Sequence, residues 1–223
     1  AAIFGLMIER IFFARLVGES VFSMVMVTIG LLILIRGVVL VLFGPQVRAF
    51  PMVFPIDPLI FGDILISRSM FYGGLLTIAI GFGLSWFFNK TRTGLTMTAV
   101  AEDHQVAMSM GISVQRSIAF AWILGSVLST LGAMVHLSGR SINMLSSDIG
   151  LAALPVALLA GLESLAGLLL AGVLVGVIQG LASAYLDPLV GGAIGSVFPF
   201  IIMLLMLLIR PTGMFGWKTI ERV

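Results

Sequence analysis

The sequence TRTGLTMTAVAEDHQVAMSMGIS, residues 91–113, is a polar interval between two long apolar runs. Neither glycine nor proline occurs from Leu95 to Met110, and Gly111 follows as a helix C-terminal cap would. Apolar side chains recur at intervals of three or seven, at Met97, Val100, Ala107 and Met110. The charged and titratable side chains of the interval are Arg92, Glu102, Asp103 and His104. These features predict one amphipathic helix over 95–110, lying at a membrane surface with a face available to a soluble partner.

The composition of the chain is that of a membrane protein. Its 223 residues are 60% hydrophobic and 10% charged, with a mean hydropathy of +1.20, whereas a soluble domain is about 25% charged. The net charge of +2 is small and dispersed, so nothing indicates nucleic-acid binding. There is no cysteine, and the two histidines, His104 and His136, are too far apart for a metal site that is evident from sequence. We therefore expect an all-α, polytopic membrane protein without a metal site or catalytic residues.

Long apolar runs predict the membrane spans of a single domain, residues 1–223. Four prolines between residues 44 and 69 prevent a continuous helix and predict a structured external loop. Residues 1–8 are apolar but too few to cross a bilayer, so we interpret them as the end of a span and the chain as N-terminally incomplete. The expected spans are about 21–43, 70–88, 118–137, 151–186 (broken) and 189–209.

The run 151–186 is too long for one span and is interrupted at residues 161–164. Residues 151–160 are too few to cross as a regular helix, so they predict a half-helix whose passage is completed by irregular backbone that protein buries. After the break, glycines recur at every fourth position, at Gly172, Gly176 and Gly180. This spacing predicts a smooth stripe that packs closely against a neighbouring helix.

The distribution of positive charge orients the spans. If the broken segment turned back before crossing, the two sides of the membrane would carry nearly equal positive charge. If it crosses, only Arg48, Arg68 and Arg140 lie outside. The positive-inside rule therefore favours a crossing and a cytoplasmic polar interval. The positive residues inside are then Arg10, Arg15, Lys90, Arg92, Arg116, Arg210, Lys218 and Arg222.

Few polar side chains are candidates for chemistry. Glu102 and Asp103 are adjacent, so on a helix they point about 100° apart and do not converge on one substrate. They form either a solvated helix face or a docking surface. No phosphate-binding loop occurs in the chain, so any energy coupling would come from a partner.

Polar residues inside the spans are candidates for lining a translocation pathway. The alternative is that the hydroxyls hydrogen-bond to their own helix and that the arginine extends its stem to the membrane interface. The candidates are Thr28, Arg36, Ser126, Thr130 and Gln179.

Three motifs resemble one family of transporters. The polar interval contains Thr91-Arg92-x-Gly94, then Ala99-x-Ala101-Glu102-Asp103, Ala107 and Gly111-Ile112. A glycine-rich break, AGLESLAG, occupies residues 160–167, and RPTGMFG occupies residues 210–216. Together they resemble the permease subunits of branched-chain amino-acid ABC importers of the Liv type, particularly the H-type subunit. Two positions depart from the family pattern: Thr98 stands where an arginine is frequent, and Glu163 stands in the break where glycine is frequent.

The resemblance implies a permease subunit in a transmembrane helical bundle, with N-terminal spans absent from this chain and a cytoplasmic coupling helix within the loop 89–117. It implies a second permease subunit, two cytoplasmic ATPase subunits that use ATP and Mg, and an extracytoplasmic substrate-binding protein, in the lipid of the bacterial inner membrane. The chain itself would bind no cofactor and would not be an enzyme. The residues that would couple to the ATPase are Arg92, Gly94, Glu102, Asp103, Ala107 and Gly111.

The solute is only partly indicated by the resemblance. Branched-chain amino acids or similar small polar solutes are expected, while related permeases move urea, short amides or other small acids. A secondary transporter is a further alternative, and it would need an ion-coupling carboxylate within the membrane. Glu163 is the only candidate for that role.

Overall fold

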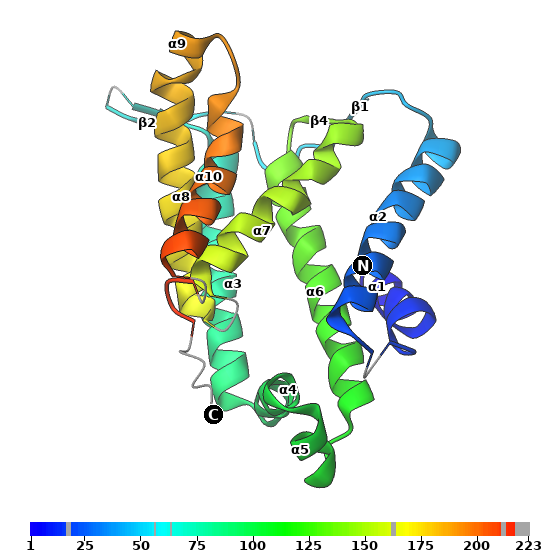
Figure 1. Ribbon diagram of the computed structural model, residues 1–223. Coiled ribbons are helices and arrows are strands. Elements are labelled where there is room, and N and C mark those ends of the chain that lie inside the picture. Colours follow the sequence, from blue (N-terminus) through cyan, green and yellow to red (C-terminus); the bar gives the residue numbers. More distant parts are fainter. Residues whose placement is uncertain (17–18, 56, 63, 162–163, 211–212, 217–223) are drawn as a thin grey trace. The chain divides into compact units, whose positions relative to one another are not determined.

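The computed structural model describes residues 1–16, 19–55, 57–62, 64–161, 164–210 and 213–216, and these residues are mostly helical (Figure 1). They form two compact units. The first unit contains residues 1–77 and 86–144, and the second contains residues 78–85 and those from 145 onward. The single permease domain stays a prediction. Residues named above that lie outside the described part are Leu162, Glu163, Pro211, Thr212, Lys218 and Arg222.

The first unit holds most of the long helices, and residues 78–85, in the middle of the helix Arg68–Lys90, are counted with the second unit. Within the described residues, four helices are long and apolar enough to cross a membrane: Phe22–Phe43, Arg68–Lys90, Val114–Leu137 and, in the second unit, Leu165–Tyr185. In chain order, the helices are α1 Ala2–Ile8, a π-helix Glu9–Phe13, α2 Val21–Phe43, α3 Arg68–Lys90, α4 Arg92–Glu102, α5 His104–Ser109 and α6 Val114–Leu137.

The bounds of the spans follow from local end signals. α2 covers the residues expected for the first span. At its start the Ser20 hydroxyl accepts a hydrogen bond from the Ser23 amide, and at its end Gly44 leaves the helix with φ 74°. α3 and α6 begin earlier than expected, at Arg68 and Val114. Hydropathy alone places a span by its apolar centre, so polar residues in a terminal turn are missed.

The expectation of one helix over residues 95–110 is wrong. Asp103, with φ −154° and ψ 114°, is extended and separates α4 from α5. Its Oδ1 atom accepts hydrogen bonds from the amides of Gln105 at 2.7 Å and Val106 at 3.0 Å. A short carboxylate side chain that bonds nearby amides competes with the helix and starts a new one.

α1 packs on the middle of α6. Gly5 permits the close approach, because a Cβ atom there would collide with the side chain of Ser126 and lie 2.6 Å from the Trp122 carbonyl oxygen. The aromatic ring of Phe13 continues this contact, with its centroid 4.5 Å from that of Trp122. The N-terminal residues are therefore held on α6 by the close helix contact at Gly5 and by the packing of the Phe13 and Trp122 rings.

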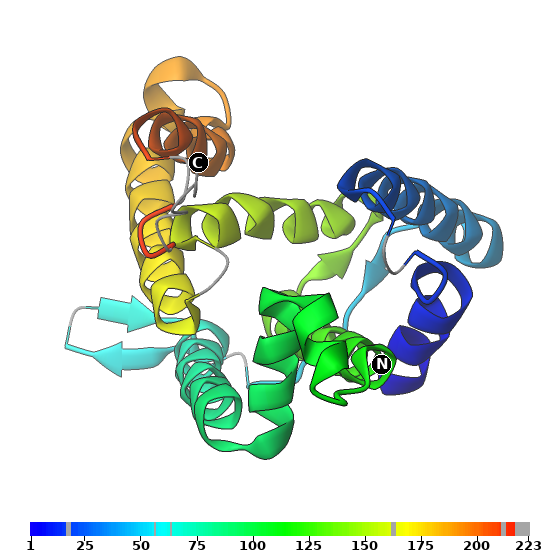
Figure 2. The same cartoon turned by 60° about the horizontal axis from the view of Figure 1, so that its bottom comes forward.

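The loop between α2 and α3 contains short strands, which the sequence analysis did not predict. β1 Arg48–Ala49 pairs antiparallel with β4 Ser141–Ile142, which follows α6. β2 Leu59–Phe61 and β3 Ile64–Ile66 form a hairpin beside the start of α3 (Figure 2). The expected structured loop is therefore tied to the end of α6 by a strand pair.

Besides residues 78–85 of α3, the described part of the second unit contains four helices, which follow a short 3₁₀ turn at Met144–Ser147. Leu159, Ala160, Ala171 and Val175 form its buried core. α7 is the expected half-helix: its 13 residues reach about 20 Å, short of the roughly 30 Å hydrocarbon layer. The helices are α7 Asp148–Ala160, α8 Leu165–Tyr185, α9 Asp187–Val190 and α10 Ile194–Ile209.

The last span begins five residues later than the expected 189–209, at Ile194. Asp187 and Pro188 start a separate single turn, α9, which Gly191 ends with φ 65°. The Asp187 Oδ1 atom then accepts a hydrogen bond from the Gly195 amide at 2.9 Å. The chain therefore turns once before α10, and the aspartate satisfies an amide at the start of that helix.

The glycine-rich break and the C-terminal motif meet at the end of α7. The amides of Met214 and Phe215 donate to the carbonyl oxygens of Leu159 at 2.8 Å and Ala160 at 3.2 Å. These carbonyls belong to the last turn of α7, where no intrahelical donor remains. The segment 213–216 therefore closes the half-helix with its backbone.

The glycine stripe on α8 does not face the core of this unit. A Cβ atom at Gly176 or Gly180 would meet no atom within 4 Å, and one at Gly172 would reach only Val156, at 3.8 Å. The buried residues of α8 instead lie one position earlier along the helix, and they include Ala171 and Val175. Packing of the stripe against a neighbouring helix therefore stays a prediction, and among the described residues only Val156, beside Gly172, lies within reach of it.

Candidate functional site

The candidate site is formed by α4 and α5, the two short helices at the start of α6 (Figure 1). Thr91 begins α4: its hydroxyl accepts a hydrogen bond from the Gly94 amide at 3.0 Å and donates to the Phe87 carbonyl at 2.7 Å. A Cβ atom at Gly94 would collide with that carbonyl oxygen and lie 2.6 Å from the Cα atom of Phe88. α4 therefore lies directly on the last turn of α3, and glycine makes the contact possible.

A small buried cluster attaches the same helices to α6. Val100 of α4, Ala107 of α5 and Val114 of α6 are 4%, 3% and 5% exposed, and Ile112 and Ile118 pack around them. The turn after α5 is closed by the Ile112 amide, which donates to the Ala107 carbonyl at 3.0 Å. α4 and α5 are thus held to both neighbouring spans.

The opposite face of this element is exposed and chemically mixed. Glu102, Asp103 and His104 are exposed polar residues at the junction of α4 and α5. Val106, Met108 and Met110 are 58%, 57% and 77% exposed. Exposed apolar side chains beside charged ones are characteristic of surfaces that bind proteins.

A cavity of about 390 Å³ lies between α4 and the start of α6. Its walls include the hydroxyls of Thr93 and Thr96, the guanidinium-bearing Arg116 and the ring of Phe120. This cavity offers hydrogen-bond donors and an apolar wall beside the exposed face. It has room for one side chain of a bound protein.

Asp103 has an altered pKa in this site. The amides of Val106 and Gln105 stabilise its carboxylate and hold the pKa of Asp103 below its ordinary value of 3.8, and the nearby His104 acts in the same direction. Because the folded pKa is depressed, the cap contributes stability above the unfolded pKa and loses it as pH falls through the folded pKa. The carboxylate therefore stays ionised and bonded at neutral pH.

We expect Asp103→Ala to loosen the start of α5, because two amides lose their acceptor. Asp103→Asn should keep α5 intact, since asparagine caps helices as well as aspartate does. Hydrogen–deuterium exchange of the amides at positions 105 and 106 at neutral pH checks this, with faster exchange in the alanine variant only. Equal exchange in both variants would show that the side-chain cap does not hold α5.

The structure brings the expected coupling residues into one element but divides them into two sets. Gly94 and Ala107 are buried, so Ala107 cannot touch a docked protein directly and instead holds α5 against α4 and α6. Gly111 has φ 78°, which explains a glycine at this turn. The exposed set is Arg92, Glu102, Asp103 and Gly111.

The candidates for a translocation pathway belong to three different helices, α2, α6 and α8. The hydroxyl of Thr28 on α2 donates to Val25, and that of Thr130 on α6 donates to Ser126. Ser126 donates to Ile123 of its own helix and to Ala1. These hydroxyls therefore hydrogen-bond to their own helices, which is the alternative to lining a pathway. Their role in translocation stays a prediction. The two others are Arg36, half-buried on α2, and Gln179, half-buried on α8.

Sequence reasoning missed two features of this element. Val114 anchors the site, yet a valine at the start of an apolar span looks like any residue that faces lipid. The cavity beside Arg116 and Phe120 depends on how α4 crosses α6, and no local pattern reports a crossing. The Gly94 position was visible in the sequence, but its contact with the end of α3 was not.

Comparison with known proteins identifies the family. The model of the family described as "Branched-chain amino acid transport system / permease component" matches residues 1–207. The high-affinity branched-chain amino acid transport system permease protein BraD of Pseudomonas aeruginosa is 29% identical, over 99% of this chain and 72% of BraD. No solved structure gives a significant match.

Two further relatives agree with this result. The permease protein LivH of Escherichia coli is 25% identical over the whole of this chain and 73% of LivH. A probable branched-chain amino acid transport permease protein LivH of Methanocaldococcus jannaschii is 28% identical over 69% of this chain and 51% of its own length. The chain therefore belongs to the family of branched-chain amino acid transport permeases, as a multi-pass permease subunit of an ABC importer in the inner membrane.

Proposed function

We propose that this permease subunit moves branched-chain amino acids or similar small polar solutes, and that α4 and α5 are the element through which a cytoplasmic ATPase drives it. The partners are a second permease subunit, two ATPase subunits and an extracytoplasmic substrate-binding protein. The ATPases bind ATP and Mg, since this chain contains no phosphate-binding loop. The relatives are named for branched-chain amino acids, which supports this solute class.

One observation supports the coupling role above all others: the exposed face of α4 and α5 is anchored to two spans at once. Gly94 lets α4 pack on the end of α3, and the cluster of Val100, Ala107 and Val114 packs α4 and α5 against α6. A force applied to a loosely attached loop would bend the loop and leave the spans in place. A packed, close contact transmits displacement instead, because protein interiors have low compressibility.

The chemistry of the exposed face suits a protein cleft. Glu102 offers a carboxylate to basic or amide donors of the ATPase, and Val106 and Met110 offer apolar surface. Methionine adapts its shape to irregular apolar surfaces. The cavity beside Arg116 accepts a side chain from the opposite partner. Docking would therefore combine one charged contact with an adaptable apolar one.

We expect Glu102→Lys to abolish ATP-driven leucine uptake by the reconstituted importer and to reduce co-purification of the ATPase with a tagged permease. A lysine facing basic donors at a desolvated contact costs several kcal/mol. Glu19→Lys is the matched control, because Glu19 is an exposed glutamate in the loop before α2, on the side of the membrane expected to be cytoplasmic. Uptake through the control variant should stay near that of the unsubstituted complex.

Cross-linking tests the same contact directly, because the chain has no cysteine of its own. His104→Cys leaves the Asp103 cap in place and should form a disulfide with single-cysteine ATPase variants. Normal uptake by Glu102→Lys, together with no cross-link from position 104, would remove α4 and α5 from the ATPase interface.

A further inference from the structure

A second cavity of about 390 Å³ lies within the first unit, at the ends of α3 and α6 that are remote from α4 and α5. α3 has 23 residues, so about 34 Å of helix separates this cavity from the element described above. The cavity is therefore at the opposite membrane surface, expected to be external. Its size is within the range of about 300–1,000 Å³ that small-molecule sites occupy.

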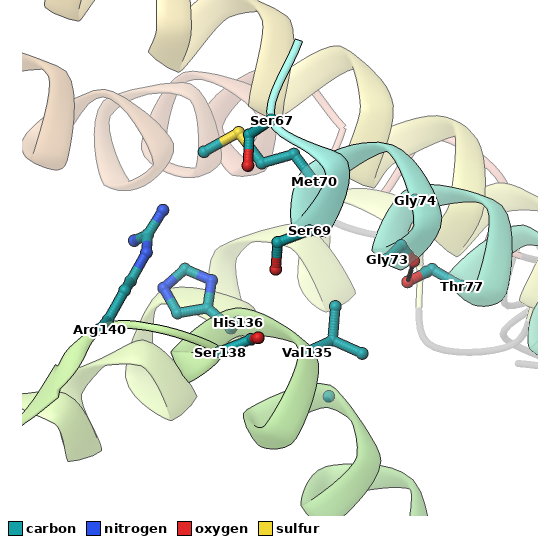
Figure 3. Close-up of a pocket in the computed structure, with 11 residues that line it drawn as sticks. Ser67, Ser69, Met70, Gly73, Gly74, Thr77, Val135, His136, Ser138 and Arg140 are labelled. Atoms are coloured by element: carbon teal, nitrogen blue, oxygen red, sulfur yellow. Dashed lines mark hydrogen bonds between the residues drawn. The ribbon is translucent and has the colours of Figure 1, made fainter. Parts of the chain in front are cut away.

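The polar wall of the cavity consists of hydrogen-bond donors. Ser67 and Ser69 lie at the start of α3, and Figure 3 shows Ser69 on the other side of the cavity from His136 and Arg140. The Ser67 side chain does not cap α3, and no acidic residue occupies its first turn. The first amides of a long helix therefore remain available at this wall, together with the positive end of the helix dipole.

The charge of the cavity has one sign. Arg140 carries a permanent positive charge, and none of the described residues that line the cavity is acidic. A carboxylate is the group that such a wall binds, since guanidinium and carboxylate form strong charge-assisted hydrogen bonds.

The remaining wall is apolar and open. Met70 and Val135 provide apolar side chains, and Gly73, Gly74 and Gly132 provide none. α3 and α6 meet at Gly73, where a Cβ atom would collide with the Val135 side chain. At Gly74 and Gly132 a Cβ atom would meet nothing within 4 Å, so these two glycines leave open volume large enough for a short alkyl group.

The position of Arg140 is fixed by its backbone. Its carbonyl accepts a hydrogen bond from the Phe50 amide at 2.9 Å, and its amide donates to Leu137 at 2.9 Å. The neighbouring Ser138 hydroxyl accepts from the amides of Val53 at 3.0 Å and Phe54 at 3.3 Å. The loop after α2 thus holds the arginine at the cavity, which prepares the site before a ligand arrives.

We propose that this cavity binds the transported solute by its carboxylate, with Arg140 as the counter-charge, the start of α3 as a second donor set, and Met70 and Val135 against the alkyl chain. This inference rests on the proposed function, because it assigns the cavity to the same solute. It limits the solute class to short alkyl chains that carry a carboxylate, and it excludes urea and neutral amides as ligands of this cavity.

The first test is leucine uptake by the complete importer in proteoliposomes. Arg140→Gln should raise KM by about tenfold or more, the loss expected for one charge-assisted hydrogen bond, with little change in kcat. Arg140→Lys should restore most of the affinity. Arg48→Gln is the matched control, because Arg48 belongs to the strand paired with β4 but does not line the cavity. Thermal unfolding of each complex verifies that the variants remain folded.

The second test measures occupancy without transport. Ser69→Cys in the otherwise cysteine-free chain is labelled with a maleimide in the assembled complex. Leucine and isovalerate should slow labelling, because both carry the carboxylate, and leucinamide should not. Ser109→Cys on α5 is the control and should label at one rate throughout.

The outcomes separate the two proposals. Equal labelling with and without leucine, or an unchanged KM in Arg140→Gln, overturns the cavity as a carboxylate site and leaves the proposed function intact. Protection by leucinamide equal to that by leucine also overturns it. Absence of leucine uptake in the unsubstituted importer overturns the proposed solute, whereas protection of position 69 by carboxylates would still support the site.

Discussion

Replacing Gly213 with alanine should lower the stability of the second unit by about 2–6 kcal/mol, the combined cost of a left-handed non-glycine residue and of overpacking. Gly213 has φ 78°, and a Cβ atom there would lie 2.6 Å from the Cα atom and 2.7 Å from the nitrogen of Gly161. Both obstacles are backbone atoms, so no side chain can rotate away. To accept the methyl group, the segment 213–216 must leave the end of α7.

The loss would extend beyond the clash itself. When the segment leaves, the carbonyls of Leu159 and Ala160 lose the amides of Met214 and Phe215. Phe215 also leaves Gly167, where a Cβ atom would now lie 2.7 Å from its ring. The end of α7 and the start of α8 would then both lose their contacts with the segment 213–216. The half-helix α7 needs these contacts, because irregular backbone within a membrane must be buried by protein.

Thermal unfolding of the purified permease complex in detergent checks this prediction, and the midpoint should fall clearly in Gly213→Ala. Gly150→Ala on α7 is the matched control, because it adds the same methyl group where no atom lies within 4 Å, and alanine favours a helix more than glycine does. Equal midpoints for the two variants would mean that the segment 213–216 does not hold the end of α7.

Gly94→Ala should uncouple the importer while leaving the chain folded in the membrane. The new methyl group would collide with the Phe87 carbonyl oxygen and lie 2.6 Å from the Phe88 Cα atom, so α4 must lift from α3. Such overpacking costs about 1–3 kcal/mol, and a strain of that size allows a loss of roughly tenfold or more in a coupled equilibrium. ATP-driven leucine uptake should fall accordingly.

The control for this variant is Gly125→Ala on α6, where a Cβ atom meets nothing within 4 Å. Membrane yield should be similar for both variants, and only Gly94→Ala should lose uptake per complex. Full uptake by Gly94→Ala would show that the seat of α4 on α3 is not needed for transmission of force.

The helices were predictable from sequence where a single physical signal decides them. α2 is apolar except for Arg36 and a few hydroxyls between the Ser20 cap and Gly44, and the structure has a helix over the same residues, 21–43, that were expected for the first span. The half-helix α7 was predicted because Gly161 and its neighbours interrupt an apolar run that is too long for one span. The length of an apolar run and the position of a glycine that can end a helix are local properties, so both can be read from the sequence.

Other features depend on choices that a sequence leaves open. Asp103 is compatible with the middle of a helix and with the cap of a new one, and the structure selects the cap. The spacing of Gly172, Gly176 and Gly180 shows that they share a face but not which helix covers it. The bonds from Met214 and Phe215 to α7 involve backbone atoms far apart in the chain, so no side-chain pattern records them.

The contact of α4 with the end of α3 at Gly94 also means that a movement of α4 can tilt the whole of α3. α3 is a continuous rod of 23 residues, about 34 Å long, so a tilt of about 10° at the end held by Gly94 would swing the other end through about 6 Å. That other end carries Ser69 and one wall of the cavity that Arg140 lines. A tilt of that size, driven at the surface expected to be cytoplasmic, is therefore large enough to change the gap between Ser69 and Arg140 with no bending of the helix.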